Sequence, residues 1–227
     1  MEDNIVVWVL FGVISWSAVF ILVRSVLPKR SFDFCNRLVS TVHVFLAVIL
    51  SCLSVQDWRC PLCPLVSPPT TSQKRAMAVT LSYLIYDFIC CLFDTQISID
   101  NLIHHIVSII GLGAALVYRM CGLVMVTTLC LTEMSSPFLH LREILKELGY
   151  RDTNLNFSAD LSFAVIFTFG RIVLGPFVPY VTLTTDNPLL IKAMSLSLQM
   201  VCVFWFYKIA RMVRYKVAKR KTSTKMA

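Results

Sequence analysis

Residues 5–23 read IVVWVLFGVISWSAVFILV, a run without a single charged side chain. An α-helix rises about 1.5 Å per residue, so a helix over this stretch is about as long as the ~30 Å hydrocarbon core of a bilayer is thick. Similar apolar stretches follow at 38–55, 76–93, 102–119, 121–138, 159–181 and 190–212. The pattern predicts an all-α, polytopic membrane protein with about seven transmembrane helices.

The composition favours the same fold class and excludes several others. Hydrophobic residues make up 57% of the 227 residues and charged residues only 15%, against about 25% charged residues in a typical soluble domain. The net charge of +8 comes from the tail, because eight basic residues lie from Lys208 onward and the other 13 are balanced by 13 acidic residues. A basic tail beside a span favours anionic membrane lipids as partners. We expect no nucleic-acid partner and, without zinc-finger spacing, no metal site.

The distribution of Lys and Arg predicts the orientation. One set of loops and ends carries 15 basic residues, including the C-terminal tail, and the opposite set carries five. Cytoplasmic loops are enriched in basic residues, so we expect a cytosolic C-terminus and a lumenal or extracellular N-terminus. The first apolar stretch follows acidic residues, which favours a retained span over a signal peptide. Lys225, third from the end, is half of a retrieval signal, and we expect the endoplasmic reticulum rather than the plasma membrane.

Most of the nine cysteines lie inside apolar runs, where they are typical of small hydrophobic residues. Cys60 and Cys63 form a CxxC in a loop. Whether they form a disulfide depends on the side of the membrane that the loop faces, and the sequence leaves this open.

Polar and titratable residues interrupt the apolar stretches mostly in the half predicted to face the cytosol. The candidates are Arg37, His43, Asp87, His104, His105, Ser108, Glu133 and Arg171. A charge at the bilayer centre costs at least about 2.5–3.5 kcal/mol on insertion scales. We therefore expect Asp87, Glu133 and Arg171 to face one another inside the bundle, around a ligand-binding cavity open to the cytosol. The alternative is that the charges only pair and fix the helix register, and for His43 this structural interpretation is favoured.

The two adjacent histidines cannot both face one cavity, because successive residues of a helix point about 100° apart. His104 shares a stripe with Ser108 and other small residues, so we expect it to line the cavity and His105 to pack against a neighbouring helix. Farther along, the stretch 135–154 predicts an amphipathic helix on the membrane surface, with Leu141 and Leu145 on its apolar face.

Five stretches occur in an order that resembles the TLC domain. They are RLVSTVH (37–43), LSYLIYDF (81–88), HHIVSIIGL (104–112), LTEMSSPFL (131–139) and FTFGRIVLGP (167–176). The resemblance is nearest to the TLC domain-containing protein 5 branch and more distant to the ceramide synthases. It implies a bundle of six helices around a lipid-accepting cavity. We expect a first transmembrane helix and linker at 1–31, the TLC membrane domain at 32–215 and a basic tail at 216–227.

The resemblance also implies candidate catalytic residues. His104 and His105 match the histidine pair that carries acyl transfer in ceramide synthases, and Glu133 stands where those enzymes have an Asp. Thr132 and Ser136 replace a further His and Asp of that pattern.

Three functions follow as hypotheses. The first is binding or handling of sphingolipids or phospholipids in the cavity, with an influence on membrane lipid composition. The second is a ceramide-synthase-like N-acyltransferase that uses acyl-CoA as co-substrate, with no other cofactor. The third is a proton-linked transporter, because chains of acids and histidines also form proton relays. The sequence leaves the protein partners unknown, and a homo-oligomer is possible.

Overall fold

The computed structural model describes residues 4–55, 67–93 and 98–226, with side chains described through residue 218. The Cys60–Cys63 pair lies outside the described residues. The described chain is helical and holds these elements: α1 (Ile5–Val26), α2 (Phe32–Ser54), α3 (Thr71–Phe93), α4 (Ile99–Tyr118), α5 (Gly122–Glu133), α6 (Ser136–Glu147), α7 (Asn154–Phe167), η1 (Thr168–Val173), α8 (Phe177–Thr184) and α9 (Leu189–Met226).

Seven helical segments within the described residues are long and apolar enough to cross a membrane. They are Ile5–Val26, Phe32–Ser54, Thr71–Phe93, Ile99–Tyr118, Gly122–Glu147, Asn154–Thr184 and Leu189–Ala218. The prediction of an all-α polytopic membrane protein with seven spans is confirmed.

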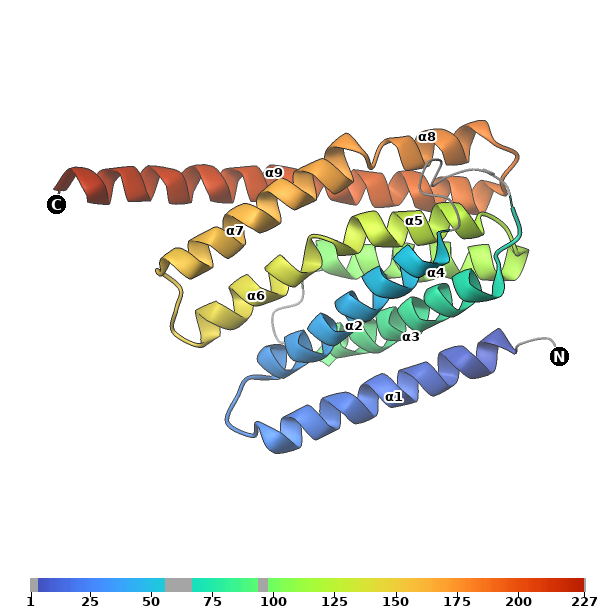
Figure 1. Ribbon diagram of the computed structural model, residues 1–227, viewed down its shortest axis with the longest axis horizontal. Helices are drawn as coiled ribbons and strands as arrows, with labels where there is room; N and C mark the ends of the chain where they lie inside the picture. The colour runs from blue at the N-terminus through green and yellow to red at the C-terminus, as the bar shows by residue number, and fades with distance from the viewer. Residues whose placement is uncertain (1–3, 56–66, 94–97, 227) are drawn as a thin grey trace.

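The helices form an elongated bundle. Helix α1 packs along α3, which also contacts α2 and α4, and α9 packs along α4 and α8 (Figure 1). Helix α1 begins at one end of the bundle and α9 finishes at the other, extending beyond its neighbours (Figure 1). This is the arrangement that an odd number of spans requires.

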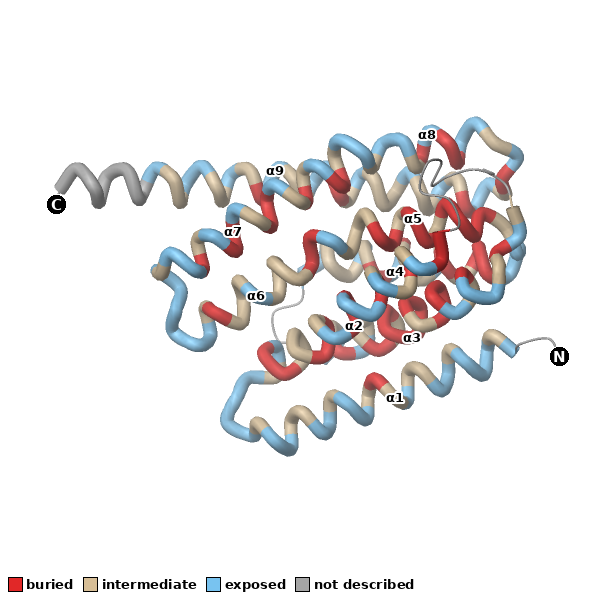
Figure 2. Tube along the Cα trace, in the orientation of Figure 1, coloured by how far each residue is buried: buried red, intermediate tan, exposed pale blue. Residues whose placement is uncertain are grey.

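Burial separates the core from the outer helices. Buried residues gather on α2, α3 and α5, whereas most of α1 is exposed (Figure 2). The exposed side chains of α1 are large and apolar, among them Leu10, Phe11 and Ile14, and Trp16 is the side chain it buries. Exposed apolar side chains on this scale are expected of a surface in contact with lipid.

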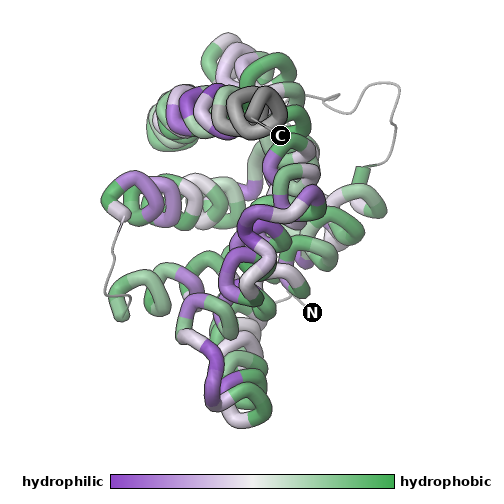
Figure 3. The backbone as a smooth tube through the Cα atoms, turned by 90° about the vertical axis from the view of Figure 1, so that its left-hand side faces the viewer, coloured by the Kyte–Doolittle hydropathy of each residue, from purple (hydrophilic) through white to green (hydrophobic). Residues whose placement is uncertain are grey.

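Hydrophilic segments gather at the end of the bundle where α9 finishes, which faces the viewer in Figure 3. Local signals fix the helix boundaries at this end. Ser31 caps α2 by accepting a hydrogen bond from the Phe34 amide, and Thr153 caps α7 by accepting one from the Asn156 amide. At the opposite end, the predicted tight turn between α4 and α5 places Arg119 and Cys121 in the left-handed region, at φ values of 54° and 58°.

The helix predicted within 135–154 is present as α6, which continues from α5 in one apolar helical segment, Gly122–Glu147. Pro137 lies in the first turn of α6, where the helix axis restarts after Met134 and Ser135. Helix α6 packs against α2 and α7, and Leu145 is buried. Leu141 and Leu148 of the same apolar stripe are exposed, so the stripe packs against protein at Leu145 and leaves an apolar surface on either side of it.

The sixth span is broken at its centre. Residues 168–173 form a π-helix between α7 and α8, a rare geometry that is frequent at functional sites. Gly170 allows this segment to approach α5, since a Cβ there would lie 2.9 Å from the Leu131 carbonyl oxygen. The distortion directs Arg171 into the bundle, where it is 6% exposed.

Candidate functional site

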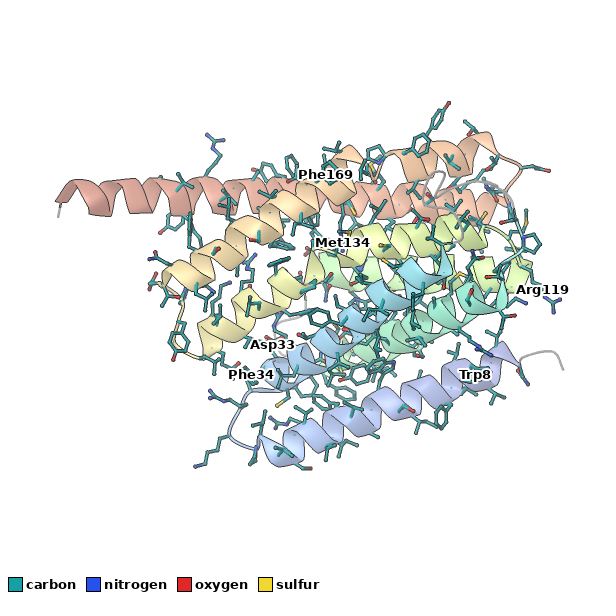
Figure 4. All side chains as sticks on the ribbon, viewed as in Figure 1. Trp8, Asp33, Phe34, Arg119, Met134 and Phe169 are labelled. Carbon is teal, nitrogen blue, oxygen red and sulfur yellow. The ribbon has the colours of Figure 1, made fainter. Side chains whose placement is uncertain are left out.

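A polar chamber of about 510 Å³ opens at the end of the bundle where α9 finishes. Residues from the start of α2, the end of α3, the start of α4, and α6, α7 and α9 enclose it. Its polar lining includes Asn36, Arg37, Asp87, Asn101, His140 and Lys208. Asp33, another lining residue, lies at this end of the bundle, whereas Arg119 lies at the far end (Figure 4).

Asp87 is the centre of a hydrogen-bond network on one wall of the chamber. Its Oδ1 accepts a bond of 2.7 Å from Asn36 Nδ2, and its Oδ2 lies 2.9 Å from His105 Nε2. The Tyr86 hydroxyl donates to Asn36 Oδ1 at 2.7 Å, which orients the amide toward Asp87. The network joins α2, α3 and α4 and fixes the carboxylate in position.

Both ring nitrogens of His105 are occupied. Nδ1 lies 2.8 Å from the carbonyl oxygen of Asn101, which can only accept, so Nδ1 carries a hydrogen. Nε2 faces the Asp87 carboxyl at 2.9 Å, and that contact is favourable only with a proton between the two atoms. His105 is 3% exposed. It therefore connects helices and has no free nitrogen to offer a ligand unless one of these bonds breaks.

Asp87 and His105 also belong to a group that could hold a metal ion, which the sequence interpretation did not include. With Cys91 they offer three ligand atoms that lie within 4.8 Å of one another. These are residue types that bind zinc. A bound cation would replace the shared proton between Asp87 and His105, and the Asn101 carbonyl would hold the other ring nitrogen, as in many metal sites.

A second, apolar cavity of about 90 Å³ lies deeper, between α4, α5, α8 and α9. Four of the predicted site residues line it: His104, Ser108, Glu133 and Arg171. The ring of His104 lies edge-on to that of His105, with the centroids 5.6 Å apart, and 4.9 Å from the ring of Trp205. Its Nδ1 is buried and has no hydrogen-bond partner within the described residues, so His104 differs from His105 in having a nitrogen available.

Arg171 lines both cavities and marks the place where they meet. Its Nη2 donates to the Thr132 carbonyl at 2.5 Å, and its guanidinium lies over the rings of Phe167 and Trp205 at 5.2 and 5.9 Å. Gln199 donates to its backbone carbonyl at 3.1 Å and so satisfies an acceptor in the π-helix. The predicted contact of Asp87 with Arg171 is replaced by the pairing of Asp87 with His105.

Comparison of the sequence with known protein families identifies the domain that these spans form. The TLC domain matches residues 33–211, most of the chain. The chain belongs to the TLC domain family. It is similar to TLC domain-containing protein 4-B of Danio rerio, with 29% identity over 219 residues that cover 87% of this chain and 81% of that protein. The match includes the second to seventh spans, and α1 precedes it.

The two remaining predicted site residues, Arg37 and His43, lie in different parts of the bundle. Arg37 lines the polar chamber and forms an ion pair with Asp33, 2.6 Å away. His43 lines neither cavity: its ring stacks on Tyr83 at 3.7 Å, and Trp16 of α1 packs edge-on against both rings. Its prediction as a ligand-binding residue is not supported by this position, which agrees with the structural alternative. His43 helps α1 dock on the TLC bundle.

Sequence reasoning missed an ionic cluster beside the polar chamber. Asp160 of α7 is 1% exposed and pairs with Arg142 of α6 at 3.0 Å and with Lys216 of α9. Asn156, also fully buried, donates to the Arg142 carbonyl at 2.7 Å. An acid inside the apolar stretch 159–181 was the available signal, because such a residue needs a partner within the bundle.

Proposed function

We propose that this protein binds membrane lipids, sphingolipid or phospholipid, in its intramembrane cavities and thereby influences membrane lipid composition. The observation that carries the proposal is the pairing of a polar chamber of about 510 Å³ with an apolar cavity, with Arg171 shared between them. An amphipathic ligand matches this division, with its polar group in the chamber and its chain toward the apolar cavity. Membership of the TLC family supports the assignment to lipids.

The proposed orientation places the polar chamber at the cytosolic face. The chamber opens where α9 finishes, and the eight basic residues from Lys208 onward favour that end as cytosolic. The N-terminus is then lumenal or extracellular. We place the protein in the endoplasmic reticulum, in line with Lys225 near the C-terminus.

The proposal is tested by purifying the protein in a mild detergent and identifying retained lipids by mass spectrometry. His104→Phe keeps an aromatic ring against Trp205 but removes both nitrogens, and it should reduce the retained lipid without loss of folded protein. His43→Phe is the matched control, because it makes the same change in the stack on Tyr83, outside both cavities. Absence of any stoichiometric lipid from the folded wild-type protein would contradict the proposal.

Acyl transfer is the second candidate, and the unpartnered Nδ1 of His104 favours it. That nitrogen could accept the proton of an attacking amine, whereas both nitrogens of His105 are engaged. Incubation of the purified protein with acyl-CoA and a sphingoid base distinguishes the candidates. Release of free CoA that depends on His104 would favour the transferase, and a bound lipid without turnover would favour binding.

A further inference from the structure

Arg171 is a buried cation that forms no ion pair within 4 Å among the described residues, although Glu133 lines the apolar cavity with it and interacts with it through its charge. It is 6% exposed, and the part of the chain that the structure describes offers no hydrogen-bond partner to its Nε and Nη1. A carbonyl oxygen, that of Thr132, accepts from Nη2. A buried charge is strongly unfavourable unless it is paired. The guanidinium is therefore suited to an anion that is not part of the protein.

The other cations of the polar chamber already have acidic partners. Arg37 pairs with Asp33 at 2.6 Å, and Lys208 pairs with Asp100 at 3.0 Å. Arg142 lies 3.0 Å from Asp160. The acid Asp87 is likewise satisfied by its bonds from Asn36 and His105. These side chains neutralise one another. Glu133 lies near enough to Arg171 to interact with its charge, but among the described residues it accepts no hydrogen bond from Nε or Nη1, so these two donors are open to a ligand.

The position of Arg171 limits the chemical class of anion that could bind to it. It lies where the polar chamber meets the apolar cavity. In a phospholipid, the phosphodiester occupies the corresponding place between the headgroup and the acyl chains. The carboxylate of a fatty acid is terminal and would leave the chamber of about 510 Å³ without a ligand group. Ceramide carries no anionic group.

We propose that Arg171 binds the phosphodiester of a phospholipid, with the headgroup in the polar chamber and an acyl chain directed toward the apolar cavity. This inference rests on the proposed lipid-binding function and names its ligand class. Charge-assisted hydrogen bonds from a guanidinium to phosphate are among the stronger polar contacts in proteins. The cation–π contacts with Phe167 and Trp205 hold the guanidinium in place when the site is empty.

The test is a native mass spectrometry titration of the purified full-length protein with matched probes. Dioctanoylphosphatidylcholine and dioctanoylglycerol share their chains and differ in the phosphate-bearing headgroup. Octanoate supplies a carboxylate, and inorganic phosphate supplies the anion without a lipid. The wild-type protein should bind the phosphatidylcholine about ten- to a hundredfold more tightly than dioctanoylglycerol, since a hydrogen bond to a charged group contributes about 1.5–3 kcal/mol. Inorganic phosphate alone should bind weakly.

Arg171→Gln should reduce phosphatidylcholine binding by a similar factor and leave dioctanoylglycerol binding unchanged. Arg171→Lys keeps the charge and should retain more phosphatidylcholine binding than the Gln variant. Arg211→Gln makes the same change on the exposed side of α9, away from both cavities, and should bind as the wild type does. If Arg171→Gln does not fold, the wild-type preference among the probes and the Lys variant decide the question.

The outcomes separate this inference from the proposed function. Equal wild-type binding of phosphatidylcholine and dioctanoylglycerol, or unchanged phosphatidylcholine binding by folded Arg171→Gln, would refute the role of Arg171 and leave lipid binding intact. Preference for octanoate would replace the phospholipid with a fatty acid. Binding of neither lipid would overturn both proposals. Tight binding of inorganic phosphate alone would identify a soluble phosphate ligand and refute the phospholipid.

Discussion

The contact between Asp87 and His105 gives the strongest single prediction about stability. Their side chains are 15% and 4% exposed, and Oδ2 lies 2.9 Å from Nε2. Removing one member of a buried pair costs about 3–5 kcal/mol in soluble proteins, because the other member is left without its partner. For a chain of this size, about 2–4 °C of melting temperature corresponds to 1 kcal/mol. Asp87→Leu and His105→Leu should therefore each lower the melting temperature by roughly 6–20 °C.

The substitutions should not be additive. Asp87→Leu with His105→Leu removes both polar groups and should recover stability relative to the less stable single variant. Asp87→Asn should be milder, with a loss of about 1–2 kcal/mol, because the amide still donates to Nε2 of a neutral His105. His105→Leu should fall toward the low end of its range, since Asn36 continues to donate to Asp87.

The assay is thermal unfolding in detergent. After heating to each temperature, the fraction of the protein that still elutes as a single folded species is measured. Asp33→Leu is the control, because it breaks the ion pair with Arg37, whose side chains are 51% and 26% exposed. A surface pair of this kind contributes about 0–1 kcal/mol. A double Leu variant whose loss equals the sum of the two single losses would show that Asp87 and His105 are not coupled. A control loss as large as theirs would refute the argument from burial.

Three further predictions concern other parts of the molecule. Asp160→Leu should lower the melting temperature because Lys216 loses its carboxylate and the buried Arg142 keeps only its contact with Glu143, and adding Arg142→Leu should restore part of the loss; an unchanged melting temperature for the single variant would contradict this. Gly122→Ala should reduce the folded yield, because the added Cβ would lie 2.5 Å from the backbone of Pro69. Gly113→Ala has open space around the added Cβ and should gain up to about 1 kcal/mol of stability from helix propensity. Equal folded yields of the two variants would refute the distinction. A glycosylation acceptor appended to the N-terminus should be modified and one appended to the C-terminus should not, as read by a mass shift that an N-glycosidase removes; the reverse result would invert the orientation.

The sequence predicted the spans well because their signal is local. Uninterrupted apolar stretches of membrane-spanning length have few other structures available to them. Helical spacing also predicted that His104 and Ser108 would share a cavity, and both line the apolar one. These inferences depend on the spacing of apolar and polar residues along a single helix, which the sequence gives directly. The single polar cavity expected for all the candidate residues is divided into two, with Asp87 in the polar chamber and His104 and Glu133 in the apolar cavity.

The partners of the charged residues could not be predicted in the same way. The pairing of Asp87 with His105, rather than with Arg171, depends on the rotation of α3 against α4, which no spacing within one helix determines. The π-helix at 168–173 also changes the direction of Arg171 relative to a regular helix. Helix α6 shows the same limit: its stripe of leucines predicted an apolar face, but the spacing did not show that Leu145 would be buried in the bundle while Leu141 and Leu148 stay exposed.

The central claim is that a lipid occupies the interior of the bundle, and photo-crosslinking tests it most directly. Cells expressing the protein would be fed a fatty acid that carries a diazirine and an alkyne, so that their acyl lipids become reactive on illumination. We predict that peptide mapping finds crosslinks on residues of the apolar cavity, including Gly111, Met194 and Ser195, and that His104→Phe reduces them. Crosslinks confined to exposed apolar positions such as Ile110 and Val203 would contradict the account.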